Sequence, residues 1–197
     1  SIKRDVDFMY VILPFEKEFY EKKHGFPVHF VGHPLIDAIA RREQVVPSVF
    51  KKEHGMDERP IIALLPGSRK QEISKMLKVM LSVVVIAGAP SQEASFYEPF
   101  LKKQNVHLLL NKTYDLLSIS HAALVTSGTA TLETALFKVP QVVCYKGSRV
   151  SYEIAKRVIN LNYISLVNLI LDKPAVVELI QTDFNTKRVN EELTQIL

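Results

Sequence analysis

Two short stretches of the chain carry residue types whose spacing suits the binding of an anion. Residues 61–69 read IIALLPGSR and precede the helical pattern KQEISKMLKVML, whereas residues 122–131 read AALVTSGTAT and precede LETALF. In each stretch an apolar run ends at a small turn that opens directly into a helix. Such a turn directs free backbone N–H groups and the positive end of a helix dipole toward an anion. A phosphate-bearing ligand is therefore the first expectation.

The first turn also offers a basic side chain. Arg69 begins the helix after the PGS turn, where its planar guanidinium would reinforce the N–H groups of Gly67 and Ser68. We therefore expect Arg69 to contact a diphosphate. The alternative is that Arg69 forms a surface ion pair with Glu72, one helical turn further on.

The second turn offers hydroxyl groups as well as N–H groups. It consists of Ser127, Gly128, Thr129 and Ala130, which can bind phosphate oxygens. A plain N-cap formed by Ser127 or Thr129 would need the same residues, so the two interpretations are compatible. Two such turns on one sheet indicate a diphosphate, because a single phosphate needs only one. Neither turn has the GxGxxG or GxxxxGK[ST] pattern, which disfavours NAD and ATP.

The elements that must position these turns alternate regularly. From residue 60 onward, apolar strand-like runs are followed by helical patterns, which predicts a parallel sheet covered on both faces. The expected strands are 6–13, 28–31, 61–65, 83–87, 106–110, 122–125, 141–145 and 163–166, and the expected helices are 14–24, two within 34–55, 69–81, 91–104, 113–120, 129–138, 148–160 and a helical tail. The predicted fold is a doubly wound, Rossmann-like α/β domain. Ligands of such sheets bind at the carboxyl ends of the strands, where both turns lie.

Composition and charge narrow the class of protein. The 197 residues are 47% hydrophobic and 23% charged, as in ordinary globular proteins. The net charge is +4, but basic and acidic residues are interleaved, so a nucleic-acid partner is not expected. The single Cys144 lies in an apolar run, which excludes a disulfide framework and fits a cytosolic, reducing setting. No signal peptide is visible, and no apolar run approaches the roughly 20 residues that span a bilayer.

Two features suggest that the sequence is incomplete. It starts with SIKRDVDFMYVILPF, without an initiator Met and directly before a strand-like run, which indicates a piece of a longer protein. Around residues 82–84 a helical pattern runs into a strand-like VVVIAG without the short connection that a reversal of direction requires. We therefore expect residues to be missing there, and a continuous backbone would disprove this hypothesis.

Several motifs together resemble a known family. The segments LLPGSRKQEI, SGTATLETALFKVPQVVCYK, ILPFEKEFYEKKHGFPVHFVGHPLID and AKRVINLNYISLVNLI are similar to those of the lipid-A-disaccharide synthases, bacterial glycosyltransferases of the two-domain GT-B fold. The resemblance covers nearly the whole chain. It implies that residues 33–197 form a truncated carboxyl-terminal, nucleotide-sugar-binding domain. Residues 1–32 resemble the end of the preceding acceptor domain and its linker, and the rest of that domain is absent.

The resemblance implies a reaction. The family transfers 2,3-diacylglucosamine from its UDP donor to 2,3-diacylglucosamine 1-phosphate with inversion and releases UDP. The catalytic base is expected in the absent domain, so this chain is expected to carry no catalytic residue, and alone it is expected to bind UDP without turnover. GT-B enzymes generally stabilise the leaving diphosphate without a metal, and no cofactor is expected. The pairs Asp5 with Asp7 and His29 with His33 are poorly placed for a metal site.

The resemblance adds three candidate residues to the donor site. Glu133 lies about one turn into its helix, where a carboxylate could accept both ribose hydroxyls of UDP, although acidic residues are also common near helix starts. Tyr145 ends a strand and is a candidate neighbour of uracil or phosphate, with a plain core or surface position as the alternative. Asn168 matches a polar family position facing the donor, although a turn could equally satisfy its amide.

Partners follow from the same resemblance. Acylated substrates imply peripheral work at the cytoplasmic face of the bacterial inner membrane, and the family suggests a possible homodimer. Two rival interpretations remain open at this point. One is another UDP-sugar enzyme of the GT-B fold, such as a UDP-N-acetylglucosamine 2-epimerase or the peptidoglycan glycosyltransferase. The other is a UDP-binding module without activity of its own.

Overall fold

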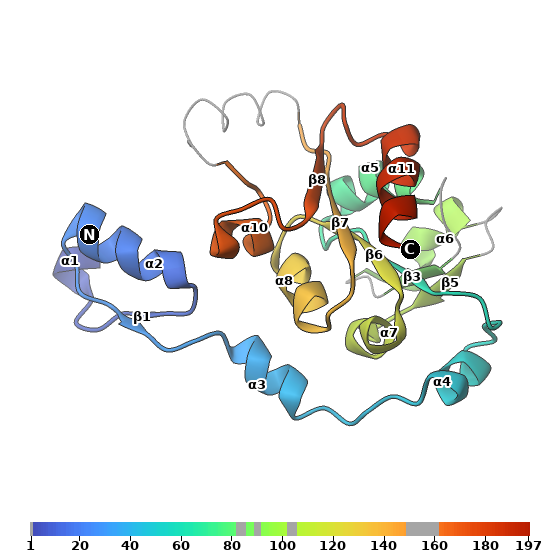
Figure 1. Ribbon diagram of the computed structural model, residues 1–197, viewed down its shortest axis with the longest axis horizontal. Coiled ribbons are helices and arrows are strands. Elements are labelled where there is room, and N and C mark those ends of the chain that lie inside the picture. Colours follow the sequence, from blue (N-terminus) through green and yellow to red (C-terminus); the bar gives the residue numbers. More distant parts are fainter. Residues whose placement is uncertain (1, 82–85, 89–91, 102–105, 149–161) are drawn as a thin grey trace.

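A parallel sheet forms the centre of the chain (Figure 1). The computed structural model describes residues 2–81, 86–88, 92–101, 106–148 and 162–197. Four strands pair in the order β3-β6-β7-β8, and their bounds are Ile62–Leu65, Ala122–Thr126, Gln141–Tyr145 and Val177–Ile180. Strand β4 (Ile86–Gly88) pairs with β5 (His107–Leu109) and lies beside β3. The strand order is therefore β5-β4-β3-β6-β7-β8. Starting from β3, the chain first adds strands on one side and then, from β6, on the other, so the strand order reverses between β3 and β6.

Helices cover both faces of this sheet, because alternate residues of each strand point to opposite sides. On one face Leu64, Leu124 and Val142 belong to a core that includes residues of α5 (Lys70–Met80), α6 (Ala94–Leu101) and α11 (Thr186–Ile196). On the other face Leu65 and Val125 pack with residues of α4 (Pro47–Glu53) and α7 (Thr113–Ile119). The predicted doubly wound, Rossmann-like α/β fold is confirmed.

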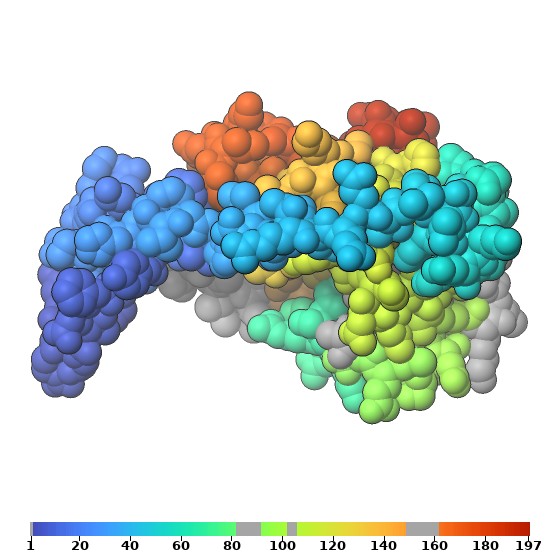
Figure 2. All heavy atoms as spheres, turned by 90° about the horizontal axis from the view of Figure 1, so that it is seen from below, coloured from blue at the N-terminus to red at the C-terminus, as the bar shows by residue number. Residues whose placement is uncertain are grey.

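Residues 2–30 form a small unit at one end of the molecule (Figures 1 and 2). It contains α1 (Ile2–Asp5), β1 (Tyr10–Val11), α2 (Pro14–Glu18), the π-helix η1 (Phe19–Lys23) and β2 (His29–Phe30). Strands β1 and β2 are parallel, and Val11, Phe26 and Val28 form a separate buried cluster. From there, α3 (Pro34–Ala40) and α4 run as a strip along one face of the main body (Figure 2).

In the described residues between 61 and 145 the predicted and observed elements agree closely. The strand predicted at 141–145 has those bounds, and the helix predicted at 129–138 is α8 (Thr129–Leu136). The helix expected at 148–160 and the hypothesis of missing residues near 82–84 fall on parts of the chain outside the described residues.

Three predictions about the chain ends were wrong. Residues 6–13 do not form one strand, because β2 pairs with only two residues of β1. Residues 163–166 do not form a strand: residues 163–165 are an irregular connection, and Leu166 begins helix α10 (Leu166–Leu171). The predicted helical tail contains strand β8, which pairs with β7. The apolar run at 163–166 resembles a strand locally, but two of its N–H groups bind the carboxylate of Glu178 and not a neighbouring strand.

Candidate functional site

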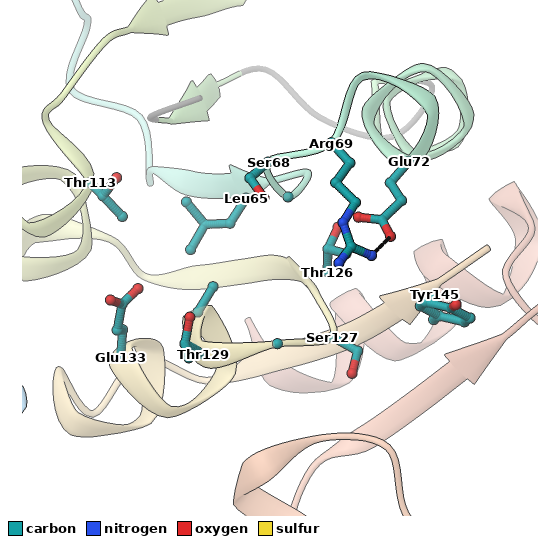
Figure 3. A pocket seen from close by; sticks show the side chains of 13 residues that line it. Leu65, Ser68, Arg69, Glu72, Thr113, Thr126, Ser127, Thr129, Glu133 and Tyr145 are labelled. Carbon is teal, nitrogen blue, oxygen red and sulfur yellow. Dashed lines mark hydrogen bonds and ion pairs between the residues drawn. The ribbon is translucent and has the colours of Figure 1, made fainter. Parts of the chain in front are cut away.

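A cavity of about 410 Å³ opens at the carboxyl ends of β3 and β6, where the strand order changes direction. Ligands of doubly wound sheets bind at this place. The turn after β3, the turn after β6, the first turns of α7 and α8 and the end of β7 surround the cavity (Figure 3). The lining residues are Leu65, Gly67, Ser68, Arg69, Glu72, Thr113, Thr126, Ser127, Gly128, Thr129, Ala130, Glu133 and Tyr145.

The structure brings together every candidate residue of the sequence analysis except Asn168. The two turns, Glu133 and Tyr145 all line the one cavity, although 78 positions of sequence separate the turn at Gly67 from Tyr145. Their role in binding UDP stays a prediction. Sequence reasoning did not select Thr113 or Thr126, which also line the cavity. Their positions in the sequence pattern could have indicated both, because Thr126 ends β6 and Thr113 begins α7 at the same edge of the sheet.

The first turn is held in place from two sides. Gly67 has a φ of +95°, and a Cβ atom added to it would lie 3.3 Å from Cγ2 of Thr126. The side-chain amide of Gln92 donates a hydrogen bond of 2.7 Å to the carbonyl oxygen of Ser68. The turn therefore packs directly on the end of β6. This close approach joins the two halves of the site.

Replacing Gly67 by alanine tests this packing. The positive φ and the contact with Thr126 should together lower the free energy of unfolding by about 1–2 kcal/mol. Urea denaturation would measure the loss. Gly55→Ala is the matched control, because Gly55 has a φ of +64° with no atom within 4 Å of an added Cβ. If both variants lose equal stability, the close approach to Thr126 contributes nothing.

Arg69 lies at the N-terminus of α5 and makes an ion pair there. Figure 3 shows the guanidinium directed toward the carboxylate of Glu72. The Nη1 atom of Arg69 is 3.2 Å from Oε1 of Glu72, and the arginine side chain is 81% exposed. This pair is the alternative that the sequence offered for Arg69. An exposed pair of this kind is weak, so the guanidinium can exchange Glu72 for a stronger anionic partner. The N-cap residue of α5 makes no side-chain cap, and the first turn of this helix lies at the cavity.

Neither Ser127 nor Thr129 forms the plain N-cap that was the second interpretation of this turn. Gly128 occupies the N-cap position of α8 with a φ of 152°, and no side chain caps the helix. Ser127 is engaged elsewhere: its N–H donates to the carbonyl oxygen of Cys144 at 3.1 Å, and its hydroxyl donates to that of Ile164 at 2.7 Å. The first N–H groups of α8 are therefore the donors that this turn presents, as its helix geometry requires.

Thr126 also lines the cavity and carries a hydroxyl group. The residue is 5% exposed, and within the described part of the chain its buried hydroxyl makes no hydrogen bond. Buried hydroxyls nearly always have a partner, supplied by protein, water or a ligand. This hydroxyl therefore fits a site that is completed by a bound polar molecule.

Glu133 and Tyr145 lie on opposite sides of the cavity (Figure 3). The carboxylate of Glu133 accepts a hydrogen bond of 2.9 Å from the hydroxyl of Tyr114. The ring of Tyr145 folds back over Gly147, where an added Cβ would lie 2.7 Å from the tyrosine oxygen. Only a glycine at position 147 permits this orientation of Tyr145.

Asn168 lies apart from the cavity and has a structural environment. It is 1% exposed, and its amide nitrogen donates to the carbonyl oxygen of Val176 and to Glu178 at 2.9 and 2.8 Å. Its amide oxygen accepts from the N–H of Val176 at 2.9 Å. These three bonds join α10 to the segment that leads into β8. Asn168 is thus satisfied by the protein, which is the alternative that the sequence allowed.

The described residues contain no cluster of three or more His, Cys, Asp or Glu side chains that could hold a metal ion. No helix among them combines the length and the apolar composition needed to cross a bilayer.

Comparison with known proteins gives consistent results. The family model "Lipid-A-disaccharide synthetase" matches residues 1–197. Lipid-A-disaccharide synthases of Coxiella burnetii and Syntrophus aciditrophicus are 36% and 38% identical and align with 100% and 98% of this chain. The alignments cover 55% and 54% of those proteins, so the chain spans about half the length of the relatives it matches.

One solved structure supports the fold. The chain resembles WaaG, a glycosyltransferase involved in lipopolysaccharide biosynthesis, with a TM-score of 0.55 and 12% identity. The likeness covers 95% of this chain and 52% of WaaG. At this low identity it shows the architecture alone. The family model and the sequence relatives carry the assignment further: this chain belongs to the lipid-A-disaccharide synthetase family.

Proposed function

We propose that this chain binds the UDP part of the sugar donor in a glycosyltransferase of lipid A synthesis. The whole enzyme transfers 2,3-diacylglucosamine from its UDP donor to 2,3-diacylglucosamine 1-phosphate. One observation supports this proposal most: the N-termini of α5 and α8, which have no side-chain caps, lie at one cavity together with Arg69. This arrangement presents N–H donors and one guanidinium to the same anion.

The proposed site suits the chemistry of the leaving group. Negative charge gathers on the diphosphate as the bond to the sugar breaks, and fixed donors aimed at that charge lower the barrier. The N-termini of α5 and α8 supply such donors without a metal ion. The general base that deprotonates the acceptor hydroxyl belongs to the other half of the enzyme in this proposal, since the relatives are about twice as long.

The domain division and the cellular setting belong to the same proposal. Residues 1–32 are the end of the preceding domain, and residues 33–197 are the donor domain. The separate buried cluster around Val11 supports this division. The acylated substrates call for peripheral association with the cytoplasmic face of the inner membrane.

Calorimetric titration of the chain with UDP, with and without a divalent metal, tests the proposal. We expect saturable binding with the same affinity in both conditions. A requirement for metal would contradict the role given to the helix N-termini. Absence of binding would overturn the proposal that this chain holds the donor site.

A further inference from the structure

A tyrosine outside the cavity holds the carboxylate inside it. Tyr114, in the first turn of α7, donates a hydrogen bond of 2.9 Å to Oε1 of Glu133 on α8. Glu133 lines the cavity, whereas Tyr114 lines the neighbouring hollow beside Arg42. Both side chains are half-buried. Tyr114 therefore binds the Glu133 carboxylate from outside the cavity, and the part of Glu133 that lines the cavity stays accessible.

The ring of Tyr114 is itself held by neighbours on two other segments. The guanidinium of Arg42, which follows α3, lies 5.6 Å from the centroid of this ring and 5.7 Å from that of Phe137. The two rings are 5.4 Å apart. Arg42 is paired with Asp115, which also lies 3.3 Å from Lys112. These contacts restrict the tyrosine ring and so fix the direction of its hydroxyl.

The hydroxyl of Tyr114 stays a donor at ordinary pH. Burial, with a further contribution from the bond to Glu133, raises the pKa of Tyr114 to about 12. The tyrosine occupies one of the roughly four acceptor positions of the carboxylate, and the others remain available to a ligand. A glutamate held in one orientation loses less conformational freedom when the ligand arrives.

We propose that Tyr114 is a positioning residue that holds Glu133 ready to accept both hydroxyls of a ribose. The cavity then selects ribonucleoside diphosphates over analogues that lack the 2′ and 3′ hydroxyls. This inference rests on the proposed function, because it takes the ligand to be a nucleoside diphosphate whose ribose reaches Glu133.

The test compares UDP with 2′,3′-dideoxy-UDP in calorimetric titrations of the chain and its Tyr114→Phe variant. We expect the unmodified chain to prefer UDP. The variant should bind UDP about fivefold more weakly, because binding must then immobilise a freed glutamate side chain. Binding of the dideoxy analogue should not change. In a Glu133→Ala background, Tyr114→Phe should have no further effect. Tyr10→Phe, at an exposed tyrosine on β1, is the matched control and should leave both affinities unchanged.

The outcomes separate this inference from the proposed function. Unchanged UDP affinity in Tyr114→Phe, or equal weakening for both ligands, would overturn the positioning role while UDP binding stands. Equal affinity of the unmodified chain for the two ligands would also overturn it, because the cavity would not contact the ribose hydroxyls. Absence of UDP binding by the unmodified chain would overturn both.

Discussion

Replacing Arg69 by alanine is expected to weaken UDP binding by on the order of 1.5 to 3 kcal/mol, the size of a hydrogen bond to a charged group. The guanidinium lies where two helix N-termini face one cavity, so it adds a full positive charge to their partial charges. Stability should change little, because the side chain is 81% exposed and its pair with Glu72 is a surface pair. Calorimetric titration and thermal unfolding measure the two quantities separately.

Two matched variants make this result specific. Arg69→Lys keeps the charge but loses the planar fork, so its UDP affinity should fall between those of the unmodified chain and Arg69→Ala. Glu72→Gln removes the carboxylate that competes for Arg69, and UDP affinity should rise. If Arg69→Ala binds UDP as tightly as the unmodified chain, the ion pair with Glu72 is the whole role of Arg69.

The sheet and its two turns could be predicted because their signals are local. The runs at 61–65 and 122–125 are apolar throughout, and each is followed by a glycine-containing turn and a helical pattern. Because the strands are parallel, their carboxyl ends lie at one edge of the sheet, and the strand order seen in the structure places the two turns side by side. For this reason residues 67–69 and 127–130, the two turns that the sequence singled out, line one cavity.

The contacts between distant side chains could not be predicted. Nothing near Tyr114 in the sequence indicates Glu133 as its partner. The two residues lie on different helices, α7 and α8, and they meet only because both helices pack on the folded sheet. The same holds for residues 163–166, which the local pattern assigns to a strand. Their conformation depends on Glu178, a residue of the edge strand β8 that the sequence analysis read as helix.

Glu178 organises this region through one carboxylate. Its oxygens accept bonds from the N–H groups of Ile164 and Ser165, from the hydroxyl of Ser165 and from the amide of Asn168, at 2.7 to 2.9 Å. Ser165 in turn caps α10, and the carbonyl oxygen of Ile164 accepts the hydroxyl of Ser127 beside the cavity. One side chain on β8 therefore links the sheet edge, α10 and the second turn.

Replacing Glu178 by alanine should lower the free energy of unfolding by about 3 kcal/mol, because several charge-assisted bonds are lost and the buried donors of Ser165 lose their partner. Urea denaturation at neutral pH measures the loss. Glu178→Gln should lose less, since the amide oxygen can still accept part of these bonds. Glu191→Ala is the control, because this carboxylate is 44% exposed and its two ion pairs are 3.9 Å long. If the alanine variants at 178 and 191 lose similar stability, the network does not hold the connection between residues 163 and 166. In that case another contact must keep this strand-like sequence out of the sheet.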